Sequence, residues 1–142
     1  MSVNVLYTAH AASVGGRNGH VQSDDGLISV DLSMPKALGG PGKPGATTPE
    51  DLFACGYAAC FGSACDYMGV QMKLKPTSIE VRAAVGIGTI PSGFGLKVDL
   101  DVRVGGLSQA DAEKVVAAGH ALCPYSNAVK GNVEVGIKVT AV

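Results

Sequence analysis

The chain has 142 residues, of which 46% are hydrophobic, 5% aromatic and 16% charged, and its formal net charge is −1. This length predicts a single domain over residues 1–142, and the lack of a basic patch interleaved with aromatic residues argues against a nucleic-acid partner. Charged residues are scarcer than the roughly 25% of an average soluble chain, so we expect apolar surface to be hidden in a subunit interface.

The N-terminal third is predicted to be rich in β-structure. Residues 3–9 predict a strand, and the sequence GGRNG at residues 15–19 predicts a turn. Residues 20–22 and 27–32 predict a hairpin, because apolar and polar side chains alternate in the second run. Residues 35–45 hold four glycines and three prolines; we expect a surface loop rather than a linker, since neither flank is long enough to be a domain.

Residues 47–68, TTPEDLFACGYAACFGSACDYM, predict one long helix. Thr48 suits the N-cap and Pro49 the first helical position, and the acidic pair that follows complements the positive end of the helix. Residues 52–64 carry no charged side chain, so we expect a central helix that is buried on all sides. This charge-free part is shorter than a membrane span requires, so no membrane partner is expected.

The C-terminal half is predicted to alternate strands with one more helix. Residues 79–90 and 94–104 predict a hairpin, and the second run has a clear two-residue period. Residues 108–122 predict a helix that Ser108 caps and Cys123-Pro124 ends. Residues 133–142 predict a closing strand. This order predicts an α+β fold with mostly antiparallel pairing and with the helices on one side.

The four cysteines limit the chemistry that the chain can perform. The first ten residues lack a basic segment followed by an apolar run, so we expect no signal peptide and a cytoplasmic location, where structural disulfides are rare. Cys55, Cys60 and Cys65 are five residues apart, and each step of five turns about 140° around a helix axis. They cannot converge on one ion, so no zinc site is expected.

The residues alone divide the cysteines into two groups. Cys55 and Cys65 lie among small residues, which favours core positions. For Cys60 and Cys123 a core position and a reactive one both stay open. The chain turns at Cys123-Pro124, so this sulfur can lie near a surface or a cleft.

A reactive cysteine needs a cationic neighbour, because a free thiol has a pKa of about 8.5 and only the thiolate is nucleophilic. Arg17, in the glycine-rich turn, is a candidate, and a solvated turn residue is the alternative. Glu50 is a candidate partner for that cation, and a charge that only complements the helix dipole is the alternative.

Three blocks of sequence carry a resemblance to a known family. They are GGRNG at residues 15–19, TTPEDLFACGYAACF at residues 47–61 and HALCPYSNAVKGN at residues 120–132. With these blocks the chain resembles the organic hydroperoxide resistance proteins, the Ohr branch of the Ohr/OsmC family, over nearly its whole length. The resemblance implies an OsmC-like fold, in which antiparallel sheets surround a long buried central helix in an intertwined homodimer.

The resemblance also implies a reaction and its residues. The activity would be a thiol-dependent peroxidase that reduces organic hydroperoxides to alcohols. Cys60 would be the peroxidatic thiol that becomes a sulfenic acid, and Cys123 would resolve it as a disulfide. Arg17 would polarise the thiolate, and Glu50 would hold the guanidinium. No bound cofactor is implied, because dihydrolipoamide or a lipoylated protein would reduce the disulfide. Apolar surroundings would favour fatty or aromatic hydroperoxides.

The spacing of two of these residues adds a prediction about the homodimer. Glu50 and Cys60 are ten residues apart, which is about 15 Å along a helix axis. They cannot share a small site within one straight helix. We therefore expect the glutamate near Cys60 to be Glu50 of the partner subunit, whose central helix would run antiparallel.

Two other classes of function remain as alternatives. One is a non-enzymatic redox sensor, in which a Cys60–Cys123 bond changes the binding of a partner. The other is a small-molecule binding protein with structural cysteines. Cys55 and Cys65 are thiols beyond the implied pair, and their role is open. The rate of reaction with an organic hydroperoxide distinguishes the peroxidase from the sensor. Alkylation distinguishes it from the binding protein, because a peroxidase should show one fast thiol at Cys60 and a binding protein four slow ones.

Overall fold

The computed structural model describes residues 2–142 and has an α+β fold. Residues 2–52 and residues 53–142 form two compact units, and each is described by itself. The expectation of one domain over residues 1–142 stays a prediction. Within residues 2–142, no helix is both long and apolar enough to cross a membrane.

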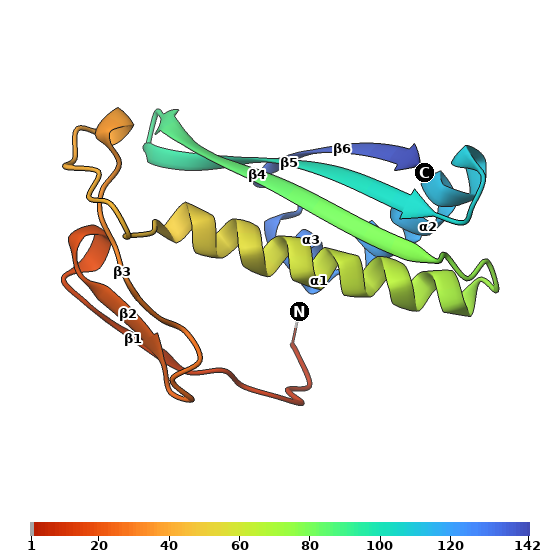
Figure 1. Cartoon of the computed structure of the whole chain (residues 1–142), viewed down its shortest axis with the longest axis horizontal. Helices are drawn as coiled ribbons and strands as arrows, with labels where there is room; N and C mark the ends of the chain where they lie inside the picture. The colour runs from red at the N-terminus through yellow and green to blue at the C-terminus, as the bar shows by residue number, and fades with distance from the viewer. Residues whose placement is uncertain (1) are drawn as a thin grey trace. The chain divides into compact units, whose positions relative to one another are not determined.

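The first unit contains a three-stranded antiparallel sheet (Figure 1). Its strands are β1 (Ala11–Val14), β2 (His20–Ser23) and β3 (Ser29–Asp31). The predicted hairpin is confirmed as β2 and β3, which pair in antiparallel register. The strand predicted at residues 3–9 is wrong: these residues form no strand, and pairing with β2 begins only at β1. A β-rich sequence becomes a strand only where a neighbour takes its hydrogen bonds, and residues 3–9 are exposed in this chain.

The glycine-rich segments form the loops that their composition predicts. GGRNG contains a short 3₁₀ helix, η1 (Gly16–Asn18), and residues 35–45 form a loop with another, η2 (Lys36–Leu38). The loop ends where Thr47 forms a parallel bridge with Leu32. The loop therefore connects the small sheet to the start of the long helix.

The long helix is confirmed as α1 (Pro49–Gln71). Its N-cap is Thr48, whose Oγ1 accepts the Asp51 backbone N–H at 3.1 Å. Burial on all sides, however, is not found within this chain. One face is buried, whereas Cys55, Ala59 and Ser63, spaced four residues apart on another face, are exposed. No described part of the chain covers this face of small residues.

The second unit places a three-stranded sheet over α1 (Figure 1). The predicted hairpin is confirmed as β4 (Ser78–Ile90) and β5 (Gly93–Gly105), and the closing strand as β6 (Glu134–Ala141). β6 pairs parallel with β5, because the chain returns through a helical crossover. This crossover comprises the predicted helix α2 (Gln109–Leu122) and a second helix, α3 (Pro124–Val129), which the sequence analysis missed.

The hydrophobic core lies between one face of this sheet and the three helices. Alternate residues of β5 are buried, and the helices supply the opposite side of the core, so the prediction that the helices gather on one side is confirmed. The buried side chains are Tyr57, Phe61, Ala64, Cys65, Val98, Leu100, Val102, Val104, Ala112, Val115, Val116, Cys123 and Val129. Two of the four cysteines are therefore core residues.

Candidate active site

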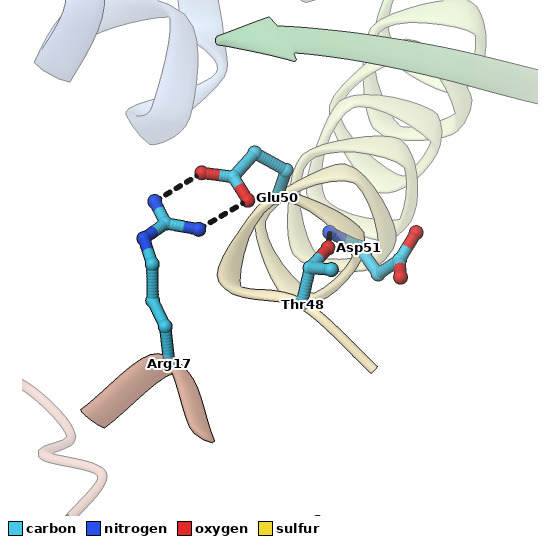
Figure 2. Close-up of polar contacts among 4 residues, drawn as sticks. All are labelled: Arg17, Thr48, Glu50 and Asp51. Atoms are coloured by element: carbon cyan, nitrogen blue, oxygen red, sulfur yellow. Dashed lines mark hydrogen bonds and ion pairs between the residues drawn. The ribbon is translucent and has the colours of Figure 1, made fainter. Parts of the chain in front are cut away.

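The structure brings Arg17 and Glu50 together in the first unit. Figure 2 shows the guanidinium of Arg17 reaching from η1 to the first turn of α1. Nη1 donates to Glu50 Oε2 at 2.8 Å, and Nη2 donates to Glu50 Oε1 at 2.5 Å. This bidentate ion pair is the geometry in which arginine binds a carboxylate most specifically. Arg17 is thus an ion-pair partner of Glu50, and its part in a reaction stays a prediction.

The loop before Arg17 depends on glycine. Gly15 and Gly16 have φ angles of 82° and 56°, a region that glycine enters without steric cost. Asn18, the residue after Arg17, holds the loop in place, since its Oδ1 accepts the Met34 backbone N–H at 2.9 Å. The guanidinium therefore projects from a short, anchored segment rather than from a free loop.

The charges of this pair reinforce each other. The hydrogen bonds from Arg17 hold the pKa of Glu50 below its usual range, and the carboxylate raises the pKa of Arg17 in return. Their side chains are only 12% and 30% exposed, respectively. Glu50 is thus an ionised partner of the cation at neutral pH, in addition to being a negative charge in the first turn of α1.

The structure brings Cys60 and Cys123 together in the second unit. Cys123 Sγ donates to Cys60 Sγ across 3.8 Å, although the residues are 63 positions apart. Cys60 lies on α1 and is half-buried, and Cys123 occupies the single position between α2 and α3. Cys123 is fully buried, so its sulfur does not lie at the surface. The two predicted pairs belong to separate units, and each is described by itself.

Proline explains why Cys123 lies at a sharp junction. Pro124 disfavours helical backbone at the residue before it, and Cys123 accordingly has φ −60° and ψ 124°. Its backbone N–H still bonds the carbonyl of Gly119 at 2.8 Å, which closes α2, and Pro124 then begins α3. The sulfur is therefore fixed at a point where two helix ends meet.

The environment of Cys60 disfavours its thiolate. Burial raises the pKa of the Cys60 thiol, and charge on Cys123 raises it further. The backbone amide of Tyr125 acts in the opposite direction and lowers this pKa. Burial is therefore the largest influence on the pKa of Cys60.

Aromatic side chains of α1 and α3 pack against one another. The ring of Tyr125 lies 5.7 Å from that of Tyr57 and 6.1 Å from that of Phe53, measured between centroids. The same ring covers the backbone of α1 at Gly56, where an added Cβ would lie 2.7 Å from Tyr125 Oη. A small residue at position 56 thus allows α3 to approach the helix that carries Cys60.

The remaining cysteines differ from each other. Cys65 is buried, as predicted, and burial raises the pKa of its thiol to about 12. Its sulfur packs on Gly119, where an added Cβ would lie only 2.5 Å away. Cys55 is exposed, so the prediction of a core position for Cys55 is wrong in this chain.

A buried hydrogen-bond chain beside the sulfurs was missed by the sequence analysis. Tyr57 Oη lies 2.7 Å from Ser126 Oγ, and Ser126 Oγ lies 2.9 Å from His120 Nδ1. Only the fold brings Tyr57 to residues 69 positions away. Within residues 2–142, no group of three or more His, Cys, Asp or Glu side chains is arranged to hold a metal ion.

Comparison with known proteins places the chain in a family. A profile of the OsmC-like protein family matches residues 40–138. An organic hydroperoxide resistance protein of Xanthomonas axonopodis pv. citri is 48% identical over 132 residues, which is 92% of each chain. A crystal structure of an organic hydroperoxide resistance protein from Legionella pneumophila is 47% identical with a TM-score of 0.91, and the match covers 96% of this chain and 99% of that one.

A second crystal structure gives the same result. An organic hydroperoxide resistance protein from Elizabethkingia anophelis is 43% identical with a TM-score of 0.92, and the match covers 99% of this chain and all of the other. The fold and the matched residues define the chain as a member of the OsmC-like family. Within this family its relatives are organic hydroperoxide resistance proteins, so the resemblance predicted from the three sequence blocks is confirmed.

Proposed function

We propose that this chain is a thiol-dependent peroxidase that reduces organic hydroperoxides to alcohols. The observation that carries the proposal is the 3.8 Å separation of the Cys60 and Cys123 sulfurs. Such a pair can form a disulfide after a small movement, because a disulfide requires about 2.05 Å between the sulfurs. The names of the relatives, organic hydroperoxide resistance proteins, support the substrate class.

The proposed reaction has two steps. The Cys60 thiolate attacks the distal peroxide oxygen, so an S–O bond forms, the O–O bond breaks, and the alkoxide takes a proton and leaves as the alcohol. The Cys123 thiol then attacks the Cys60 sulfenic acid, which releases water and leaves the Cys60–Cys123 disulfide. Two thiols are oxidised and one peroxide is reduced to alcohol and water.

Arg17 is proposed to supply the charge that Cys60 requires. A sulfur whose pKa is raised by burial needs a cation nearby to become a nucleophile at neutral pH. Arg17 remains charged at any physiological pH and presents a planar fork of donors. Glu50 holds this fork in the described chain, and the proposal assigns it the same positioning role when the guanidinium faces the thiolate.

The proposal includes a homodimer. Large apolar side chains of the first unit are exposed in the single chain: Leu6 is 92% exposed, Tyr7 82% and Leu27 86%. Several large apolar side chains this exposed in one small unit are more than an isolated chain usually leaves in water, and an assembly would cover them. We therefore retain the expectation of an intertwined homodimer in which Glu50 of the partner subunit approaches Cys60.

The catalytic cycle requires an external reductant. We propose that dihydrolipoamide, free or attached to a protein, reduces the Cys60–Cys123 disulfide by thiol–disulfide exchange and leaves as the cyclic disulfide. No bound cofactor is assigned. The rings of Phe53 and Tyr57, on the helix that carries Cys60, and of Tyr125, on the helix after Cys123, favour hydroperoxides with a fatty or aromatic body.

The test is lipoamide-dependent consumption of cumene hydroperoxide by the purified protein. Wild type is expected to release one alcohol per dihydrolipoamide oxidised, and Cys60→Ser is expected to release none. Cys55→Ser is the matched control, because Cys55 lies on the same helix but is exposed, and this variant is expected to keep the wild-type rate. Turnover by Cys60→Ser at the wild-type rate would contradict the proposal.

A further inference from the structure

The hydrogen-bond chain of Tyr57, Ser126 and His120 has no part in the reaction described above. Ser126 is its centre and is 3% exposed, and Tyr57 is fully buried. Because Ser126 Oγ lies within hydrogen-bond distance of both Tyr57 Oη and His120 Nδ1, one buried hydroxyl joins three helices. Within residues 2–142, no buried side-chain nitrogen or oxygen lacks a partner, so the connection is complete.

Each of the three residues joined by these hydrogen bonds lies three positions in sequence from Cys60 or Cys123. Tyr57 precedes Cys60 by three residues on α1, His120 precedes Cys123 by three on α2, and Ser126 follows Cys123 by three on α3. Three residues are a little less than one helical turn. The hydrogen bonds therefore tie together the turns that carry the two thiols, without using either thiol as a partner.

The position of α3 relative to α1 depends on contacts with other helices. α3 has only six residues, and a helix that short has little stability of its own. Its contacts with α1 include the Tyr125 ring, which lies over Gly56. Ser126 adds the hydrogen bond from α3 to the hydroxyl of Tyr57.

We propose that Ser126, hydrogen-bonded to Tyr57 and His120, is a positioning residue that holds Cys123 against Cys60. Disulfide formation is then faster than further oxidation of Cys60. The inference rests on the proposed function. In closure, Cys60–SOH and Cys123–SH form the disulfide and release water. In the competing step, a second hydroperoxide converts Cys60–SOH to the sulfinic acid and leaves as its alcohol. The position of Cys123 decides between these outcomes.

The first test measures how Cys60 divides between these two products. Reduced protein is mixed with one to twenty equivalents of cumene hydroperoxide, and the disulfide and sulfinic forms are quantified by mass spectrometry. Ser126→Ala is expected to raise the sulfinic fraction at least five-fold, while the rate of the first alcohol release stays within two-fold of wild type. Ser63→Ala, an exposed serine on α1, is the matched control and is expected to behave as wild type.

Two further variants separate positioning from general damage to the fold. Ser126→Ala leaves the buried Tyr57 hydroxyl and the half-buried His120 Nδ1 without a partner, whereas Tyr57→Phe/Ser126→Ala removes both hydroxyls and leaves only His120 Nδ1 without one. The double variant is expected to restore stability but to keep the high sulfinic fraction. His120→Asn, which keeps a polar atom near the Nδ1 position, is expected to remain closer to wild type than His120→Leu.

A second measurement does not depend on peroxide. In glutathione redox buffers, the equilibrium between the dithiol and the disulfide gives the effective concentration of one thiol toward the other. Ser126→Ala is expected to lower this effective concentration at least five-fold. An unchanged value in the folded Ser126→Ala variant, or an equal drop in Ser63→Ala, overturns the inference. Wild type that releases no alcohol from the hydroperoxide overturns the proposed function instead, whatever the glutathione result.

Discussion

The sulfur of Cys123 lies 3.8 Å from the sulfur of Cys60, although the two residues are 63 positions apart. One sulfur is carried by a long helix and the other by the single residue between two helices. Neither the spacing nor the local sequence requires this contact, which arises because α1 and the α2–α3 junction pack under the same sheet. The other two cysteines lie in different surroundings, so the four thiols should respond differently to an oxidant.

One equivalent of an organic hydroperoxide is expected to link Cys60 to Cys123 and to leave the other thiols free. The reason is distance, because a disulfide forms only where two sulfurs can approach to about 2 Å without backbone movement. Peptide mapping of the oxidised protein checks this outcome. Cys123→Ser is the control and is expected to give no disulfide within the chain. If the main disulfide instead joins Cys60 to Cys55 or Cys65, the contact between Cys60 and Cys123 is not the one that forms the disulfide.

Cys65 is expected to react much more slowly than Cys55. Burial raises its pKa to about 12, so its thiolate fraction at neutral pH is about 10³-fold below that of a free thiol with a pKa near 8.5. Timed iodoacetamide labelling at pH 8, read by mass spectrometry, should modify exposed Cys55 well before Cys65. Labelling of the protein in 6 M guanidinium should erase the difference. Equal rates in the native protein would contradict the assigned burial.

The elements that the sequence predicts correctly are those that local chemistry determines. Thr48 and Ser108 accept the backbone N–H three residues ahead, at Asp51 and Asp111, and so begin α1 and α2 where predicted. The β4–β5 hairpin follows the alternation of its residues, and the buried face of β5 is the apolar one. Caps and periodicity act over a few residues, so a sequence pattern is enough to find them.

The errors arise where distant parts of the chain decide the structure. Residues 3–9 have strand-forming side chains but no neighbour in this chain. α3 is too short to have a recognisable periodicity, and its Ser126 bonds Tyr57 on a different helix. Cys55 lies among small residues, as a core cysteine would, yet this part of α1 is uncovered. In the candidate site, the pairs Arg17–Glu50 and Cys60–Cys123 were predicted, whereas the hydrogen bonds of Ser126 were not.

Gly119→Ala is expected to lower the free energy of unfolding, although alanine is the better helix former. An added Cβ would lie 2.5 Å from Cys65 Sγ and 2.9 Å from Cys65 Cα, so overpacking is expected to cost about 1–3 kcal/mol. Urea unfolding followed by circular dichroism measures the difference.

Gly62→Ala is the matched control for that prediction. At this position in α1 an added Cβ meets only Val81 Cγ2, at an ordinary 3.6 Å. The gain in helix propensity is then unopposed, and an increase of about 0.5–1 kcal/mol in the free energy of unfolding is expected. Equal effects of the two substitutions would show that Gly119 is not closely packed against Cys65.

Glu50→Gln is expected to destabilise the protein at neutral pH but not in acid. The hydrogen bonds from Arg17 lower the pKa of Glu50 in the folded chain, so its stabilising contribution is complete above the unfolded pKa of about 4.3. The contribution is lost as the pH falls through the lower, folded pKa. At pH 7 the substitution should cost about 1–2 kcal/mol, since it weakens hydrogen bonds to a charged partner.

The exposed pair of Glu80 and Arg82 provides the control for this pH dependence. Glu80 accepts from Arg82 Nε at 2.6 Å, but the two side chains are 53% and 66% exposed, and solvent screens such pairs strongly. Urea midpoints at pH 7 and pH 3 should therefore change little in Glu80→Gln, whereas Glu50→Gln should fall below wild type at pH 7 and approach it at pH 3. If the deficit of Glu50→Gln is the same at both pH values, the loss comes from packing and not from the ionised contact with Arg17.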